Sequence, residues 1–211
     1  MSGAAPAAVV DAEGRPVPVS ERGPASTWSM ISFGFWLFLL SDIVIFSCLF
    51  ATYSVLSKNT NGGPGGKELF DLGNVAWETA ALLASSFTCG LMLMSAEKKQ
   101  KSNFFLWAII TWVLGAVFIT LEVREFADMV AQGHGPTHSA FLSAFFTLVG
   151  THGCHVSSGL LWLLVMMAQV GTLGLRTMVV RRLFCFSLFW HALDLVWIGV
   201  FTVVYLGAFN G

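Results

Sequence analysis

Charged residues are scarce in this sequence. Only 11% of its 211 residues are Asp, Glu, Lys or Arg, whereas 55% are hydrophobic, with 19 Phe and 8 Trp in the chain. An average soluble domain carries roughly 25% charged residues. A soluble fold of this size would have too little polar surface to cover itself, so the composition excludes a water-soluble enzyme. The formal net charge of −1 also gives no indication of a nucleic-acid partner, and we expect none.

The sequence also lacks paired cysteines. A zinc knuckle or a disulfide framework needs cysteines at close, regular spacings. The four cysteines here stand singly in apolar segments, without a C-x-x-C pair: Cys48, Cys89, Cys154 and Cys185. We interpret them as small packing residues.

Long apolar runs take the place of these missing features. A transmembrane helix needs about 20 mostly apolar residues, and five runs reach that length, at about 28–56, 75–95, 103–130, 139–171 and 179–208. Gly/Pro-rich or charged connectors separate them, at 59–67, 97–101, 133–136 and 171–182. The expected fold is therefore all-α, an integral membrane bundle of five transmembrane helices over residues 28–211.

The ends of the chain and its basic residues predict an orientation. Residues 1–27 are rich in Ala, Pro and polar residues and lack a signal-peptide pattern, so we expect a disordered cytoplasmic tail. Cytoplasmic segments of membrane proteins carry an excess of Lys and Arg. The opposite side holds only Lys58 and Lys67, and Arg124 lies within the third run. The tail and the links after the second and fourth runs hold the other eight: Arg15, Arg22, Lys98, Lys99, Lys101, Arg176, Arg181 and Arg182. We therefore expect the N-terminus inside and the C-terminus outside.

Five ionisable residues are expected deep in the bilayer. At a rise of 1.5 Å per residue, Asp42 lies about 21 Å beyond the inner start of its helix. His152 and His155 lie about 20 and 24 Å below the outer face. His191 and Asp194 lie about 14 and 18 Å from the inner face. We therefore expect a central layer of polar groups, with His155 slightly below the other four.

Three interpretations of this layer are open, because an ionisable group in a bilayer is costly and needs a partner or a function. The favoured one is structural: His191 and Asp194, at i and i+3, are neighbours on one helix face, and such groups hold membrane helices together. A proton relay through Asp42 or the His/Asp set is the second. Metal ligation is the third, although the Glu-x-x-His pairs of a di-iron bundle are absent from the sequence.

A second group of charged residues lies near the outer ends of the second and third runs: Glu78, Glu122, Arg124, Glu125 and Asp128. Arg124 can pair with the neighbouring acids or with the phosphate of a lipid headgroup. We favour pairing within the protein, because two carboxylates flank Arg124 and Asp128 follows at i+4. A lipid site in the outer leaflet is the alternative.

With these residues placed, the chain resembles subunit III of the haem–copper terminal oxidases. The resemblance covers all five expected helices. It is carried by LSDIVIFSCLFATYSV (40–55), WETAALLASSFTCG (77–90), FITLEVREF (118–126), SAFFTLVGTHGCHVSSGLLW (143–162) and SLFWHALDLVWIGVFTVVYL (187–206). The five expected helices match the last five of the longer cytochrome c oxidase subunits, a pattern similar to the five-helix subunit III of bacterial cytochrome o-type ubiquinol oxidases. The family commonly has Glu where this chain has Asp42.

The resemblance implies a function. A member of this family binds no haem or copper itself, and these cofactors are expected in the catalytic subunit of the complex. It packs mainly against subunit I, with subunits II and IV nearby, and holds structural phospholipid. It supports proton uptake and sustained turnover in a proton-pumping oxidase of the bacterial inner membrane that passes electrons from ubiquinol to oxygen.

Two other functions stay open on the sequence. The first is the same subunit in a cytochrome c oxidase, since the electron donor is chosen outside this chain. The second is a small secondary transporter, which five spans with carboxylates near the midplane permit. Inverted repeats and matching Gly/Pro breaks, which transporters often show, are not visible in the sequence.

Overall fold

The computed structural model describes residues 27–62, 65–66 and 72–210 of the chain. Residues 1–26 of the expected tail and residues 63, 64 and 67 of the connector expected at 59–67 lie outside the described residues. Within the described residues the fold is helical and contains no strand. The long helices are α1 (Thr27–Leu56), α3 (Leu72–Glu97), α4 (Lys101–Ala131), α5 (Ala140–Leu173) and α6 (Thr177–Val200), followed by a π-helical segment (Phe201–Leu206) and α7 (Gly207–Asn210).

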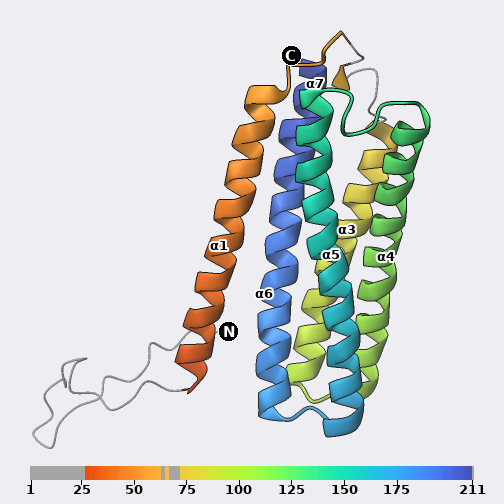
Figure 1. The fold of residues 1–211 in the computed structure, drawn as a ribbon. Coiled ribbons are helices and arrows are strands. Elements are labelled where there is room, and N and C mark those ends of the chain that lie inside the picture. The colour runs from red at the N-terminus through yellow and green to blue at the C-terminus, as the bar shows by residue number, and fades with distance from the viewer. Residues whose placement is uncertain (1–26, 63–64, 67–71, 211) are drawn as a thin grey trace, which may run out of the picture. The chain divides into compact units, whose positions relative to one another are not determined.

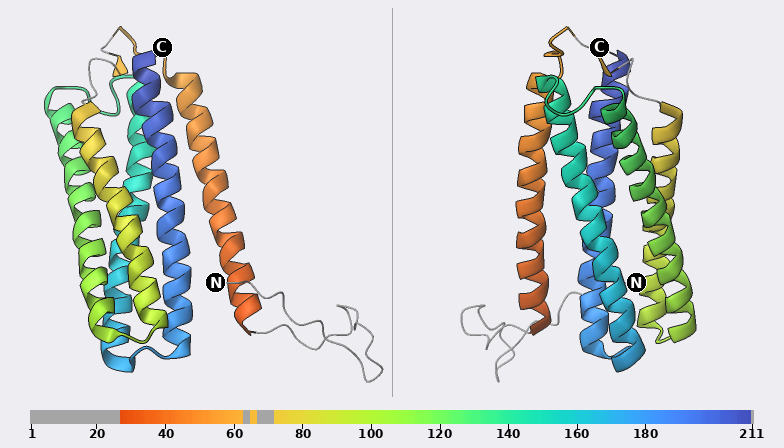
Figure 2. Two further views of the ribbon diagram at one scale, coloured as in Figure 1. Left: turned by 180° about the vertical axis from the view of Figure 1, so that it is seen from behind. Right: turned by 45° about the vertical axis from the view of Figure 1, so that its right-hand side comes forward.

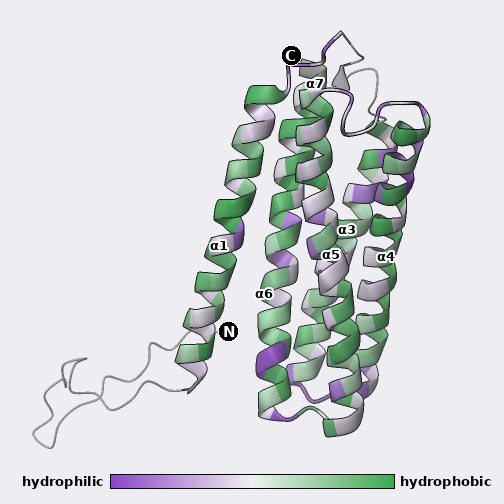
Figure 3. Ribbon diagram, in the orientation of Figure 1, coloured by the Kyte–Doolittle hydropathy of each residue, from purple (hydrophilic) through white to green (hydrophobic). Residues whose placement is uncertain are grey.

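Five of these helices are long and apolar enough to cross a membrane, with α6 and the π-helical segment counted as one. The predicted fold class, an all-α bundle of five membrane-spanning helices, is therefore confirmed. Figure 3 shows long hydrophobic stretches along these helices, with isolated hydrophilic turns partway along α5 and α6.

The helix ends follow local sequence signals. α5 begins after Ser139, whose extended backbone and side-chain oxygen, accepting from the Leu142 N–H at 3.2 Å, form an N-cap. It ends at Gly174, where φ is +70°, a conformation that side chains other than glycine rarely adopt. The connection to α6 is therefore only residues 174–176, shorter than the basic link expected at 171–182. Arg181 and Arg182 lie within α6 instead.

Helices α3 to α6 lie side by side, as the views of Figures 1 and 2 agree. The most extensive packing is between α3 and α4, and α6 packs against both α3 and α5. Large side chains fill the space between these helices. The bulkiest fully buried ones include Trp190, Trp197, Tyr205, Phe104 and Phe118. Of the five ionisable residues expected deep in the bilayer, His152 and Asp194 are buried in this core.

The chain divides into two units between Leu37 and Phe38, within α1. Thr27–Leu37 forms the first turns of the helix. From Phe38 onward, α1 contacts the bundle through rings on one face: Phe38 with Phe189 at 6.4 Å between centroids, and Tyr53 with Phe141 at 6.1 Å. Asp42 follows Phe38 by four residues and belongs to the same face.

Candidate functional site

Asp42 on α1 and His155 on α5 form a pair inside the spans. The Asp42 Oδ1 and His155 Nε2 atoms are 3.9 Å apart, and the two side chains are 16% and 24% exposed. His155 Nδ1 lies 2.8 Å from the Thr151 carbonyl oxygen. Since a carbonyl can only accept, Nδ1 carries the proton and donates it there.

This hydrogen bond fixes what His155 offers to Asp42. With Nδ1 protonated, a neutral His155 presents only a lone pair on Nε2, which would repel an ionised Asp42 carboxylate. At 3.9 Å the Asp42 Oδ1 and His155 Nε2 atoms are within ion-pair range, and their contact joins α1 to α5.

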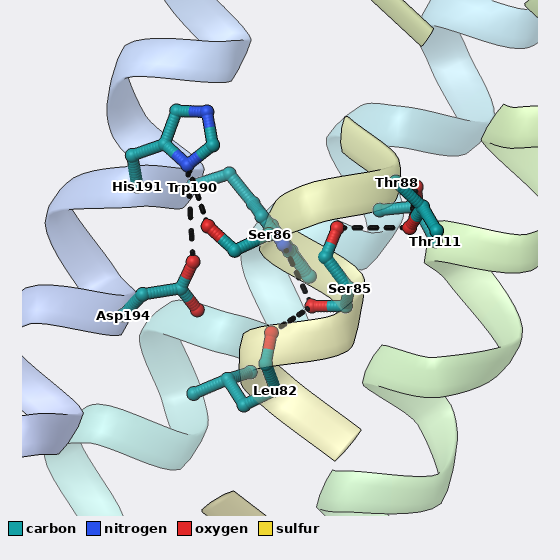
Figure 4. A network of polar contacts seen from close by, with 8 residues as sticks. All are labelled: Leu82, Ser85, Ser86, Thr88, Thr111, Trp190, His191 and Asp194. Carbon is teal, nitrogen blue, oxygen red and sulfur yellow. Dashed lines mark hydrogen bonds and ion pairs between the residues drawn. The ribbon is translucent and has the colours of Figure 1, made fainter. Parts of the chain in front are cut away.

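A second polar group joins α6 to α3, as Figure 4 shows. The Ser86 Oγ is 2.6 Å from His191 Nδ1, and the Asp194 Oδ2 is 3.9 Å from the same nitrogen. The His191 side chain is 44% exposed, whereas that of Asp194 is 7% exposed. His191 and Asp194 are therefore in contact, as their i, i+3 spacing predicts, and the closer of the two polar atoms to His191 Nδ1 is the hydroxyl of Ser86, which the spacing alone does not indicate.

Two tryptophans on α6 form further hydrogen bonds across the interface between α6 and α3, which we call the α6–α3 seam. Trp190 Nε1 donates to Ser85 Oγ at 3.0 Å (Figure 4), and Trp197 Nε1 donates to Thr79 Oγ1 at 3.0 Å. Both indoles are almost completely buried. Because a buried indole N–H without an acceptor costs free energy, these serine and threonine hydroxyls fix how α6 is rotated against α3.

His152 stands apart from both pairs. It is fully buried, and neither ring nitrogen has a hydrogen-bond partner within the described residues. Its imidazole stacks on Trp197 at 5.1 Å between centroids and meets the edges of Phe118 and Phe46 at 5.8 and 6.3 Å. Aromatic rings therefore surround it, and the structure brings together only Asp42 with His155 and His191 with Asp194.

Glu78 on α3 and Glu122 near the C-terminal end of α4 point into the bundle. Glu78 is 0% and Glu122 is 3% exposed. The Glu122 carboxyl group lies against Gly153, where an added Cβ would be only 2.8 Å from Oε1. Tyr205 donates its hydroxyl to Glu125 Oε2 at 3.3 Å, a contact that sequence spacing could not indicate. The three carboxyl groups are near enough to act on one another electrostatically.

Arg124 lies on the outer side of α4, where it lines a hollow together with Glu125 and Asp128. Its side chain is exposed, and it forms no ion pair with Glu122, Glu125 or Asp128 in the part of the chain that the structure describes. The favoured pairing within the protein is therefore not formed. Glu122, two residues before Arg124, faces another side of the helix and is buried, whereas Asp128 at i+4 lines the same hollow as Arg124 without forming an ion pair with it among the described residues.

The described residues contain no group of three or more His, Cys, Asp or Glu side chains that can hold a metal ion. Their polar atoms form hydrogen bonds between helices and provide no ligand set for a redox centre among those residues.

The chain matches the family of cytochrome c oxidase subunit III over residues 24–209. It is 57% identical over 174 residues to the cytochrome bo(3) ubiquinol oxidase subunit 3 of Pseudomonas aeruginosa, covering 82% of this chain and 83% of that protein. It is 49% identical over 177 residues to the Pseudomonas putida protein of the same name, covering 84% and 86%. It is also 47% identical over 173 residues to the cytochrome c oxidase subunit 3 of Bacillus sp. PS3, covering 82% and 84%.

Proposed function

Since the chain belongs to the cytochrome c oxidase subunit III family, we propose that it is the non-catalytic subunit III of a proton-pumping ubiquinol oxidase. Two relatives named as ubiquinol oxidase subunits, at 57% and 49% identity, support the choice of donor. The non-catalytic role is supported by the way polar groups of the described residues pair between helices, as Asp42 does with His155 and Ser86 with His191. Electrons pass from ubiquinol to oxygen in the catalytic subunit, which holds the haems and copper.

A cytochrome c oxidase is the second candidate, because the Bacillus sp. PS3 relative carries that name at 47% identity. The test is to purify the native complex in mild detergent through a tag on this chain, record its visible spectrum, and supply ubiquinol or reduced cytochrome c. Oxygen consumption with ubiquinol alone supports the proposal. Consumption with cytochrome c and none with ubiquinol overturns it.

We place the protein in the bacterial inner membrane, with subunit I as its main contact, subunits II and IV in the complex, and phospholipid bound between or beside helices. The distribution of Lys and Arg supports an inner N-terminus and an outer C-terminus. Labelling of cysteines introduced at Lys58 and at Lys98 by a membrane-impermeant reagent tests this topology. In intact cells, Lys58→Cys is expected to react and Lys98→Cys to stay unlabelled; the reverse result contradicts the orientation.

The Asp42–His155 pair is the proposed proton-holding element. Asp42→Asn keeps the shape but removes the titratable group, so we expect at least a threefold loss in the number of turnovers before inactivation, with unchanged haem spectra. Asp42→Glu should retain most of the function. Ser41→Ala is the matched control, since the Ser41 hydroxyl donates only to the Phe38 carbonyl of its own helix. Unchanged turnover in Asp42→Asn contradicts the role.

The His191–Asp194 group is the proposed assembly element. Asp194→Leu removes a buried carboxyl group at the α6–α3 seam, and we expect weaker assembly or lipid retention with normal haem spectra. Asp194→Asn, which has a similar shape and can still form hydrogen bonds, is the control with the smaller effect. Altered haem spectra in a normally assembled complex count against a purely supporting role.

A further inference from the structure

A polar hollow opens on the outside of the bundle beside Arg124. It has a volume of about 360 Å³, and its polar lining comes from Asn74, Arg124, Glu125, Asp128 and Gln132. We call it the head pocket. Arg124 forms no hydrogen bond or ion pair with the described residues, so its guanidinium group has donors to spare. An exposed guanidinium with free donors is suited to a phosphate group.

Two apolar grooves meet this head pocket. One, of about 320 Å³, runs along α4 and ends at Arg124; the other, of about 470 Å³, lies between α3 and α4 and ends at Asn74. Val117 and Leu121 belong to both grooves. These two residues, four apart on α4, form a ridge that separates the grooves. A ligand with one polar head and two apolar chains can therefore sit astride this ridge.

The depth of the head pocket fits the edge of a bilayer. The 31 residues of α4 span about 46 Å at 1.5 Å each, whereas the hydrocarbon core is about 30 Å thick. A centred helix extends about 8 Å beyond the core at each end. Arg124 lies about 10 Å before the end of α4, and Asp128 about 6 Å further out. The Arg124 side chain reaches the boundary, where lipid phosphates lie, and Asp128 lies outside it.

The signs of the charges select the headgroup. From these positions we propose that the head pocket and its grooves bind a glycerophospholipid with a primary-amine headgroup. Its phosphate accepts from Arg124, its ammonium group donates to Asp128, and each groove holds one acyl chain. A glycerol headgroup brings negative charge without an amine and meets the Asp128 and Glu125 carboxyl groups. A choline headgroup carries positive charge but has no N–H to donate.

The inference rests on the proposed function only in placing the chain in a membrane complex. The test is native mass spectrometry of the complex purified in mild detergent, followed by titration of the delipidated complex with phosphatidylethanolamine or phosphatidylglycerol. The unmodified complex is expected to retain phosphatidylethanolamine and to rebind it in preference. Arg124→Gln should reduce retention at least fivefold, and Arg124→Lys less. Asp128→Asn should keep a lipid but lose at least fivefold of the preference for ethanolamine over glycerol.

Lys58→Gln is the matched control, because Lys58 is also exposed and lines a different pocket. Its lipid retention should equal that of the unmodified complex. Two results overturn the inference: full phosphatidylethanolamine retention in Arg124→Gln, or loss of another subunit from Arg124→Gln without a change in lipid. The second result would show that a partner helix fills the grooves.

Activity measured on the same preparation separates the two proposals. If the complex oxidises only cytochrome c but its retention of phosphatidylethanolamine depends on Arg124, the ubiquinol assignment is overturned and the lipid site is supported. Ubiquinol oxidation with lipid retention independent of Arg124 supports the function and overturns the site.

Discussion

Trp190 is clamped between two glycines, and adding one methyl group there should destabilise the bundle. A Cβ at Gly159 would lie 2.8 Å from Trp190 Cζ3, and one at Gly115 would lie 3.0 Å from Cη2. Ordinary carbon contacts begin at about 3.5 Å, so Gly159→Ala forces the indole to retreat by about 0.7 Å. The Gly115 side offers no space for that movement, and the Trp190 N–H bond to Ser85, at 3.0 Å, resists it.

The size of the effect follows from these contacts. Overpacking a filled core costs about 1–3 kcal/mol, and weakening the indole hydrogen bond adds about 1 kcal/mol. Gly159→Ala should therefore cost about 2–4 kcal/mol. For a chain of this length each kcal/mol lowers the transition temperature by about 2–4 °C, so we expect a fall of roughly 5–15 °C.

The assay heats the purified complex in detergent and follows loss of this chain from the folded fraction by size-exclusion chromatography. Gly90→Ala is the control, because nothing lies within 4 Å of a Cβ added there. Trp190→Phe shortens the ring that meets the added Cβ, and only the 3.2 Å approach to Phe189 Cε1 remains of the three nearest contacts, so Gly159→Ala should cost less in that background than in the unmodified protein. A transition within about 1 °C of the unmodified protein in Gly159→Ala, or an equal loss in Gly90→Ala, would show that the contact with Trp190 does not limit stability.

Three further predictions test other contacts by the same assay. Gly153→Ala would place its Cβ 2.8 Å from the buried Glu122 carboxyl group and should cost about 1–2 kcal/mol. Adding Glu122→Asp, which is one methylene shorter, should recover the lost stability. An unchanged transition temperature in Gly153→Ala argues against the contact. Ser86→Ala removes the 2.6 Å bond to His191 and should cost about 0.5–1.5 kcal/mol, with Ser86→Thr close to the unmodified protein. Tyr205→Phe removes a hydroxyl that donates to a carboxylate and should cost about 1 kcal/mol; no loss would mean that the 3.3 Å contact contributes little.

The helical spans are predictable from sequence because each depends on local information. A run of about 20 apolar residues has to satisfy its backbone internally, and Gly174 marks one helix end by its positive φ. Depth is also local, since a fixed rise per residue converts sequence position into height. Asp42, His152, His155 and His191 accordingly lie in helices long and apolar enough to cross a membrane.

Rotation of each helix about its axis is what the sequence does not determine. His152 and His155 have nearly the same depth, but only His155 faces Asp42, while His152 faces Trp197. The Ser86–His191 bond joins residues 105 positions apart, which no spacing rule can anticipate. For Arg124 the i+4 spacing to Asp128 favours a pairing within the protein, but spacing alone does not decide whether two exposed side chains meet, and this pair is not formed among the described residues.

The π-helical segment at Phe201–Leu206 has a consequence for sequence length. A π-helix closes its hydrogen bonds over five residues instead of four, so this segment accommodates more residues per turn than the α-helix before it. The adjacent residues Val204 and Tyr205 are both fully buried there. Deleting one residue from the segment would allow an α-helix to continue and would turn Tyr205 away from the acidic residues of α4. The number of residues in the π-helical segment therefore determines in which direction the side chains of the last helical turns point.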